Sequence, residues 1–231
     1  MKKNIKNNTL ILIPVFNEGR VLGKVIKSIQ AKGFENILVV DDGSTDSTKK
    51  VAEKNNAFVV SHFLNRGAGA ATQTGIDFAK EHQYEYLVII DGDGQHHASD
   101  IINLLDKLIK TDSDMVIGNR FMNKENKFPN SRIIYNKIAN LLTCLFCNNI
   151  YTDTQSGFRA FNRTALYQIN IQNDGFEFCS DVIIMADKKG LKITEASIKV
   201  TYNEYSLNKG QNLFMGIKTG IKLILGKLIK Y

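Results

Sequence analysis

Asp91 and Asp93 follow a short apolar run, and their spacing predicts a site for chemistry. The run, Leu87–Ile90, is apolar and partly β-branched, which is typical of a buried parallel strand. Two carboxylates at positions i and i+2, with the amide oxygen of Gln95 nearby, suit a hard divalent cation such as Mg²⁺ or Mn²⁺. A polar turn that closes the strand is the alternative interpretation, because Asp-Gly pairs are common in turns.

Polar side chains also follow two earlier predicted strands. The strand predicted at 9–16 ends in Asn17 and Glu18. The next strand ends in Asp41 and Asp42. Because open α/β sheets bind ligands at the carboxyl ends of their strands, we expect all these side chains at one edge. Their mutual repulsion would be relieved by a cation or a hydrogen-bonded ligand, so a nucleotide with its metal fits the pattern.

Hydrophobic periodicity predicts the elements that bring these strand ends together. Strands and helices alternate along the first half of the chain, and right-handed crossovers convert that order into a mostly parallel sheet with helices on both faces. Strands are expected at 9–16, 36–41, 57–63, 86–90, 114–120 and 193–202, helices at 17–33, 44–55, 67–82, 98–110, 131–147 and 180–189, and a polar loop at 151–161. The apolar stretch 138–147 predicts a helix buried in the core.

Composition indicates one α/β domain with a small C-terminal appendage. The chain has 231 residues, 43% of them hydrophobic, which is enough to bury a large core. We expect a cytoplasmic protein, because no apolar run approaches the roughly 18 residues of a membrane-spanning helix and the first residues do not form a signal peptide. A net charge of +7 favours anionic partners.

Six motifs stand out along the chain. They are IPVFNE at 13–18, VVDDGSTDST at 39–48, NRGAGAATQTG at 65–75, DGDGQHH at 91–97, GNRF at 118–121 and TDTQSGFRAF at 152–161. Their order and spacing resemble the family 2 glycosyltransferases of the GT-A fold, particularly polyprenyl-phosphate sugar synthases such as dolichyl-phosphate mannose synthase. The resemblance implies a metal-dependent, inverting transfer from a nucleotide-diphosphate sugar to a polyprenyl (dolichyl or undecaprenyl) phosphate or a cell-surface glycan.

The resemblance also implies roles for individual residues. The donor nucleotide would contact Pro14, Val15, Asn17, Glu18, Asp41, Asp42, Gly69, Asp91 and Gly92. The metal, Mn²⁺ or Mg²⁺, would bind Asp91, Asp93 and Gln95. The catalytic set would be Asp93, Arg120, Asp153 and Asp181. Phosphate groups of donor or acceptor would contact Arg120, Arg132, Gln155, Ser156, Arg159 and Lys209.

Two questions stay open at this level. A hydroxyl acceptor needs a general base, for which Asp153 or Asp181 is the candidate, whereas a lipid phosphate is already an anion and needs positioning. A sugar-phosphate nucleotidyltransferase is the competing enzyme class, although no glycine-rich basic loop follows the first strand. A non-catalytic nucleotide-binding module is the third interpretation, and nucleic acid is not expected as a partner.

Residues 211–231 are predicted to be separate from the GT-A domain at 1–210. Apolar residues recur there at helical spacing, with lysines beside and opposite them. The pattern predicts an amphipathic basic helix. Such a helix either lies in a membrane interface, which would place the protein on the cytoplasmic face of the membrane, or packs on the domain or a protein partner.

Overall fold

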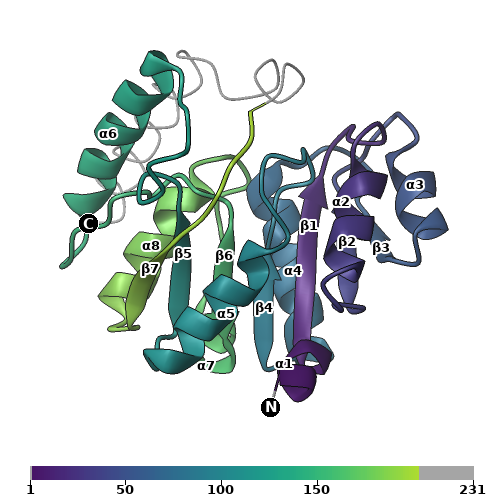
Figure 1. Ribbon diagram of the computed structural model, residues 1–231, viewed down its shortest axis with the longest axis horizontal. Coiled ribbons are helices and arrows are strands. Elements are labelled where there is room, and N and C mark those ends of the chain that lie inside the picture. The colour runs from purple at the N-terminus through teal and green to yellow at the C-terminus, as the bar shows by residue number, and fades with distance from the viewer. Residues whose placement is uncertain (1, 203–231) are drawn as a thin grey trace.

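The computed structural model describes residues 2–202 of the chain. Within that range, seven strands form one mixed, mostly parallel sheet in the order β3-β2-β1-β4-β6-β5-β7 (Figure 1). The strands are β1 (Thr9–Val15), β2 (Ile37–Asp41), β3 (Phe58–Ser61), β4 (Tyr86–Ile89), β5 (Met115–Asn119), β6 (Arg159–Asn162) and β7 (Ile193–Ser197).

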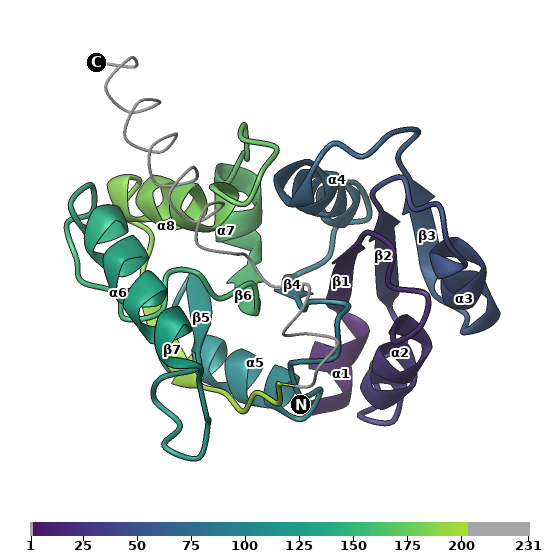
Figure 2. The ribbon, with the colours of Figure 1, turned by 90° about the horizontal axis from the view of Figure 1, so that it is seen from above.

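Helices cover both faces of this sheet. The helices are α1 (Lys2–Asn7), α2 (Leu22–Gln30), α3 (Thr48–Lys54), α4 (Ala68–Glu81), α5 (Asp100–Lys110), α6 (Asn130–Cys144), α7 (Arg163–Gln168) and α8 (Phe178–Lys188). Figure 2 shows α2 and α5 on one face and α4, α7 and α8 on the other. Side chains alternate along each strand, so Ile11 and Ile13 pack in the first core and Leu10 and Leu12 in the second. The predicted α/β architecture is confirmed.

The carboxyl ends of β1, β2 and β4 meet at one edge of the sheet, as the sequence predicts. Strand β1 is parallel to both neighbours, with Val15 opposite Asp41 and Leu12 opposite Ile89. The direction in which strands are added reverses between β1 and β4. Such a switch point leaves a crevice outside the strand ends, where open α/β sheets bind their ligands.

Strand β6 corrects the prediction of a polar loop over 151–161. It lies antiparallel between β4 and β5, with Ala160 opposite both Val88 and Val116. Periodicity does not reveal it because the strand is only four residues long and begins with a buried arginine. Because β6 runs antiparallel to β4 and β5, it begins at the edge of the sheet where those two strands end. The segment 152–158, which precedes β6, therefore lies at the edge that carries the predicted site.

Helix α6 corrects a second prediction. The apolar stretch that begins at Ile138 predicts a helix buried in the core, but Ile138 and Leu141 are exposed while Asn136 and Thr143 are buried. Hydrophobicity alone does not say which face of a helix meets the protein. Helices α1 and α7 are additional to the predicted elements.

The predictions for the C-terminal segment, namely the domain boundary at 210, the helix at 211–231 and the phosphate contact of Lys209, lie outside the described residues. In the part of the chain that is described, no helix combines the length and the apolarity needed to cross a bilayer.

Candidate functional site

Glycines bring Asp91 and Asp93 to the edge of the sheet directly after β4. Gly92 packs against the end of β1, where an added Cβ would lie 2.4 Å from Val15 Cγ1. Gly94 has φ +77°, a left-handed conformation that turns the chain and that favours glycine. A side chain at either glycine would therefore displace the two carboxylates from the switch point.

Burial and the charges of two other carboxylates raise the pKa of Asp93, and the charge of His96 acts in the opposite direction. Burial and repulsion from Asp91 raise the pKa of Asp93 to about 6, and the charge of Glu18 acts in the same direction. Gln95 opposes this in part, because its backbone N–H donates to Asp93 Oδ1 over 2.9 Å. The structure thus concentrates carboxylates at one point, where a bound cation would relieve their repulsion.

Asp91 has the opposite electrostatic environment. Burial raises the pKa of Asp91, but the hydrogen bond and charge of His96 and the charges of Arg120 and Arg159 outweigh it, so the pKa lies below its usual value. His96 Nε2 is 3.1 Å from Asp91 Oδ2. Two neighbouring carboxylates whose pKa values are displaced in opposite directions are typical of functional sites.

The donor set fits Mg²⁺ or Mn²⁺, which prefer carboxylate oxygens and share the phosphates of a substrate. Asp91 and Asp93 supply the carboxylates. The side-chain amide of Gln95 donates to Asp93, so in this structure Gln95 holds that carboxylate in place. No group of three or more His, Cys, Asp or Glu side chains forms a metal site among residues 2–202, so substrate oxygens would have to complete the coordination.

Asp42 fastens the loop that follows β3. Its two oxygens accept hydrogen bonds from the backbone N–H groups of Arg66 and Gly67, at 3.0 and 2.7 Å. His62 Nδ1 lies 2.7 Å from the same carboxylate, and His62 Nε2 lies 2.9 Å from the Thr74 hydroxyl. Asp42, predicted to contact the nucleotide, is therefore engaged in fixing the start of α4. The sequence gives no warning of this role because the His62 contact joins residues 20 apart.

The loop after β1 is joined to the loop after β2. Asn17 has φ +55°, and its N–H donates to Ser44 Oγ over 2.8 Å. Asp41 accepts from the Ser44 N–H over 3.0 Å, so the two loops share one serine. Glu18 is buried in the first loop. Pro14 and Val15 are the last two residues of β1, so they lie with Asn17 and Glu18 at the switch-point edge of the sheet.

Glycines at the start of α4 allow the segment around Asn173 to lie on the helix. The Gly69 N–H donates to the Asp174 carbonyl over 2.8 Å. An added Cβ at Gly69 would lie 2.0 Å from the Asn173 carbonyl oxygen. Gly69 was predicted to contact the donor, and its backbone N–H is engaged by the protein itself.

Gly67 provides a test of this packing. Its φ of 111° and ψ of 162° are accessible essentially to glycine alone, and an added Cβ would lie 2.3 Å from the Asp174 carbonyl oxygen. We expect Gly67→Ala to lower the free energy of unfolding by about 3 kcal/mol or more, as strain and steric overlap combine. Gly190→Ala is the matched control, because Gly190 also has positive φ but nothing lies within 4 Å of its added Cβ. Equal losses in urea denaturation of the two variants would contradict the packing argument.

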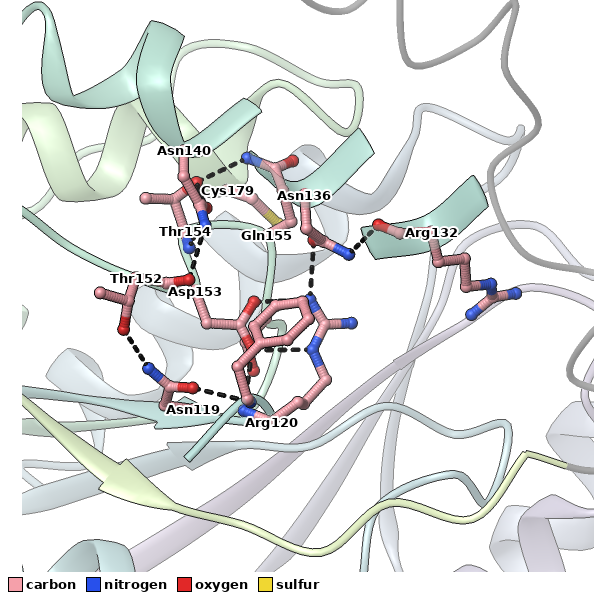
Figure 3. Close-up of polar contacts among 12 residues, drawn as sticks. Asn119, Arg120, Arg132, Asn136, Asn140, Thr152, Asp153, Thr154, Gln155 and Cys179 are labelled. Carbon is pink, nitrogen blue, oxygen red and sulfur yellow. Dashed lines mark hydrogen bonds and ion pairs between the residues drawn. The ribbon is translucent and has the colours of Figure 1, made fainter. Parts of the chain in front are cut away.

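Arg120 and Asp153 form an ion pair beyond the end of β5, in which the Asp153 side chain is fully buried and the Arg120 side chain is 13% exposed (Figure 3). Asp153 Oδ2 accepts from the Arg120 N–H and Nε, both at 2.8 Å, and Oδ1 accepts from Nη2 at 2.6 Å. Burial lowers the pKa of Arg120, but the charge and hydrogen bonds of Asp153 outweigh it and raise the pKa above its ordinary value. Asp153 is thus committed to holding the guanidinium group.

Arg159 organises the segment 152–158 from below. Its guanidinium group is buried and donates to the carbonyl oxygens of Ser156, Thr154 and Cys179, at 2.9, 2.8 and 2.8 Å. Burial lowers the pKa of Arg159. Two buried atoms here, Arg159 Nη1 and Ser156 Oγ, have no hydrogen-bond partner in the described part of the chain.

The other predicted residues are spread around this segment. Gln155 Nε2 donates to Ser180 Oγ over 2.9 Å. Asp181 lies in the first turn of α8 and accepts a hydrogen bond from the Asn173 side chain. The Arg132 guanidinium carbon lies 4.9 Å from the centre of the Tyr202 ring and points away from Asp153 in Figure 3.

Two positioning residues were missed from the sequence. Glu195 of β7 accepts from the backbone N–H groups of Thr152 and Asp153, at 2.9 and 3.1 Å. Asn140 of α6 accepts from the Thr154 N–H over 2.9 Å. One signal was available, because asparagines recur at 136 and 140, the spacing that places two residues on a single helix face.

A mostly parallel sheet with paired carboxylates at its switch point, faced by a buried arginine, defines the class as a GT-A type glycosyltransferase. The profile of the family described as Glycosyl transferase family 2 matches residues 10–169, more than half of the chain. The chain belongs to this family. The resemblance of its motifs is confirmed, and the family favours a transferase over the nucleotidyltransferase and the non-catalytic module.

The chain is similar to lipid-phosphate sugar transferases along its length. It is 33% identical to the UDP-N-acetylglucosamine–dolichyl-phosphate N-acetylglucosaminyltransferase of Methanococcus voltae, over 95% of this chain and 96% of the relative. It is 29% identical to the polyprenol monophosphomannose synthase of Mycolicibacterium smegmatis, over 89% and 82%.

A solved structure confirms the fold. Glucosyl-3-phosphoglycerate synthase from Mycobacterium tuberculosis, crystallised with Mn²⁺, uridine diphosphate and glucosyl-3-phosphoglycerate, superposes with a TM-score of 0.69. The two sequences are 18% identical, and the match covers 95% of this chain and 80% of the other. At that identity the likeness concerns the fold alone.

Proposed function

We propose that the protein transfers a sugar, with inversion, from a nucleotide-diphosphate sugar to a polyprenyl phosphate, and that the reaction requires Mn²⁺ or Mg²⁺. The observation that carries this proposal is the pair Asp91 and Asp93 at the switch point of the sheet, where burial and the charges of Asp91 and Glu18 raise the pKa of Asp93 to about 6. The names of the relatives, which include dolichyl and polyprenol phosphate transferases, support the same acceptor class.

The geometry supports an anionic acceptor over a hydroxyl. Both carboxylates nominated as general bases are engaged, Asp153 with Arg120 and Asp181 with Asn173. A phosphate oxygen needs no base, because it is already ionised. Arg120 Nη1 donates to none of the described residues, so this guanidinium group has a donor for a phosphate while Asp153 fixes its orientation.

In the proposed mechanism Asp91 and Asp93 would hold the metal, which when bound would supply positive charge to the diphosphate leaving group. The donor lies in the crevice between the ends of β1 and β4. Arg120 positions an acceptor phosphate so that its oxygen approaches the anomeric carbon from the face opposite the diphosphate, which gives inversion. Asp153, Asn136 and Glu195 are positioning residues, since they act through Arg120 and its neighbouring segment.

We further propose the domain division at 210, with 211–231 as a separate element, and a location at the cytoplasmic face of a membrane. The acceptor class supports that location, because a polyprenyl phosphate resides in a bilayer.

Ligand-dependent thermal unfolding tests the proposal. The panel contains UDP, GDP, CDP, dTDP and their common sugar conjugates, each with and without Mn²⁺. We expect one base to raise the melting temperature only with metal, since a ligand at 100 times its Kd stabilises the folded state by about 2.7 kcal/mol. The Asp93→Asn variant should lose the metal-dependent part of the shift. If no nucleotide shifts the wild-type protein, the proposed function is wrong.

A further inference from the structure

Helix α6 turns its apolar face outward and its polar face toward the rest of the protein. Four large apolar side chains are exposed along it and just beyond its end, with exposed fractions of 59% for Ile134, 52% for Ile138, 63% for Leu141 and 67% for Leu145. Their spacing of four, three and four residues places them on one face of a helix. We refer to these four residues as the apolar stripe.

The opposite face of α6 is polar and meets the protein. Thr143 is fully buried and donates to Ser180 Oγ of α8 over 2.8 Å. Asn136 is also buried, and its Oδ1 accepts from Arg120 Nη2 over 3.2 Å. A helix on the surface of a water-soluble domain normally turns its apolar face inward. The reversal indicates that the outer face of α6 meets an apolar environment.

Basic side chains accompany the apolar stripe. Lys137 is exposed between Ile134 and Ile138, and α6 itself contains no acidic residue. Lys124 and Lys127 are exposed in the loop that leads into the helix. Apolar side chains flanked by lysines are the pattern by which a helix lies in the interface of an anionic bilayer.

The surroundings favour lipid over a protein partner. A stable protein interface takes about 20 to 30 residues from each side, and the apolar stripe offers four. Among the described residues, helix α6 lies at the outer margin in both ribbon views (Figures 1 and 2), a position at which a flat surface can approach it.

We propose that the apolar stripe of α6 inserts into the interface of an anionic lipid bilayer. The inference rests on the proposed function in one respect, since a lipid-linked acceptor is what docking would supply. The inner face of α6 carries Asn136 against Arg120, so bilayer contact on one face and phosphate contact behind the other belong to the same rigid helix. Docking would thus bring an acceptor phosphate of the bilayer to the arginine.

The chain has no tryptophan, which makes a direct test available. In full-length Leu141→Trp the introduced indole is the only one. With vesicles of phosphatidylcholine and phosphatidylglycerol, we expect its emission to shift to shorter wavelength and to be largely quenched by brominated acyl chains. Phe58→Trp is the matched control, because Phe58 is 53% exposed and begins β3, the strand at the opposite edge of the sheet from β7. The emission of this second indole should not change.

Other outcomes overturn the proposal. Unchanged emission of Leu141→Trp, with or without vesicle binding of the chain, would show that the stripe does not enter lipid. Emission that is already shifted without vesicles would show that another part of the protein covers the apolar stripe. A second copy of the chain is that occupant if the shift depends on protein concentration, and the C-terminal segment is the occupant if it does not. The nucleotide panel on the same variant separates the two proposals, because a normal nucleotide shift with no lipid response rejects only the docking of α6.

Discussion

Asp93→Asn is expected to abolish sugar transfer and, in metal-free protein near pH 7, to make the fold more stable. Losing one of the two carboxylates should remove the metal from the diphosphate and lower kcat by about 10³-fold or more. The stabilisation follows because the carboxylate of Asp93 is held next to Asp91 at an electrostatic cost. A substitution that destroys activity and raises stability identifies a site that is strained for function.

The pH dependence has a definite sign. The pKa of Asp93 is about 6 in the folded protein, above the roughly 3.9 of an unfolded aspartate, so the folded state binds its proton more tightly. The stability that the wild-type protein gains from binding the Asp93 proton is fully present below pH about 4 and is lost as the pH rises through about 6. We therefore expect Asp93→Asn to exceed wild type by up to about 3 kcal/mol at pH 7.5, and by much less at pH 4.5.

Urea denaturation in EDTA at the two pH values measures this difference. Asp106→Asn is the control, because Asp106 lies partly exposed on α5 in an ion pair with Lys110 and its replacement should change stability little at either pH. If the Asp93 variant retains turnover, Asp93 does not hold the metal. If it is less stable than wild type at pH 7.5, the charge repulsion described for this site is absent.

Asp153→Ala is expected to lower the free energy of unfolding by about 3 kcal/mol, because it leaves the largely buried guanidinium group of Arg120 without its charged partner. The loss comes from an uncompensated charge and three missing hydrogen bonds. Transfer should fall as well, since Arg120 would no longer be held in one orientation. Urea denaturation and steady-state kinetics measure the two effects.

A double variant separates stability from positioning. Arg120→Met with Asp153→Leu removes both charges, so much of the stability should return while transfer stays low. Glu125→Ala is a control for a charged pair on the surface, since Glu125 meets Lys199 at 3.2 Å with both side chains exposed. Wild-type kcat in the double variant would rule out a role for Arg120 at the phosphate. Full stability of Asp153→Ala alone would mean that the pair is not buried as described.

The sequence by itself determined the alternation of strands and helices in the first half of the chain and the edge at which the ends of those strands converge. Apolar runs with sharp polar ends are local features, and the parallel arrangement follows from the βαβ connections, so Asn17, Asp41 and Asp91 could be placed at one edge without coordinates. The pair Asp91 and Asp93 could be nominated for a metal because its two members lie within one short turn.

The tertiary structure alone decided which of these polar groups are already engaged. Asp42 meets the amide of Gly67, Asp153 meets Arg120 from 33 residues away, and Arg159 is buried against three carbonyls. Such pairings depend on contacts between segments distant in sequence, which leave no periodic signal. The same reason applies to α6: its amphipathic pattern is plain in the sequence, but only the contacts of Asn136 and Thr143 reveal that its polar side faces inward.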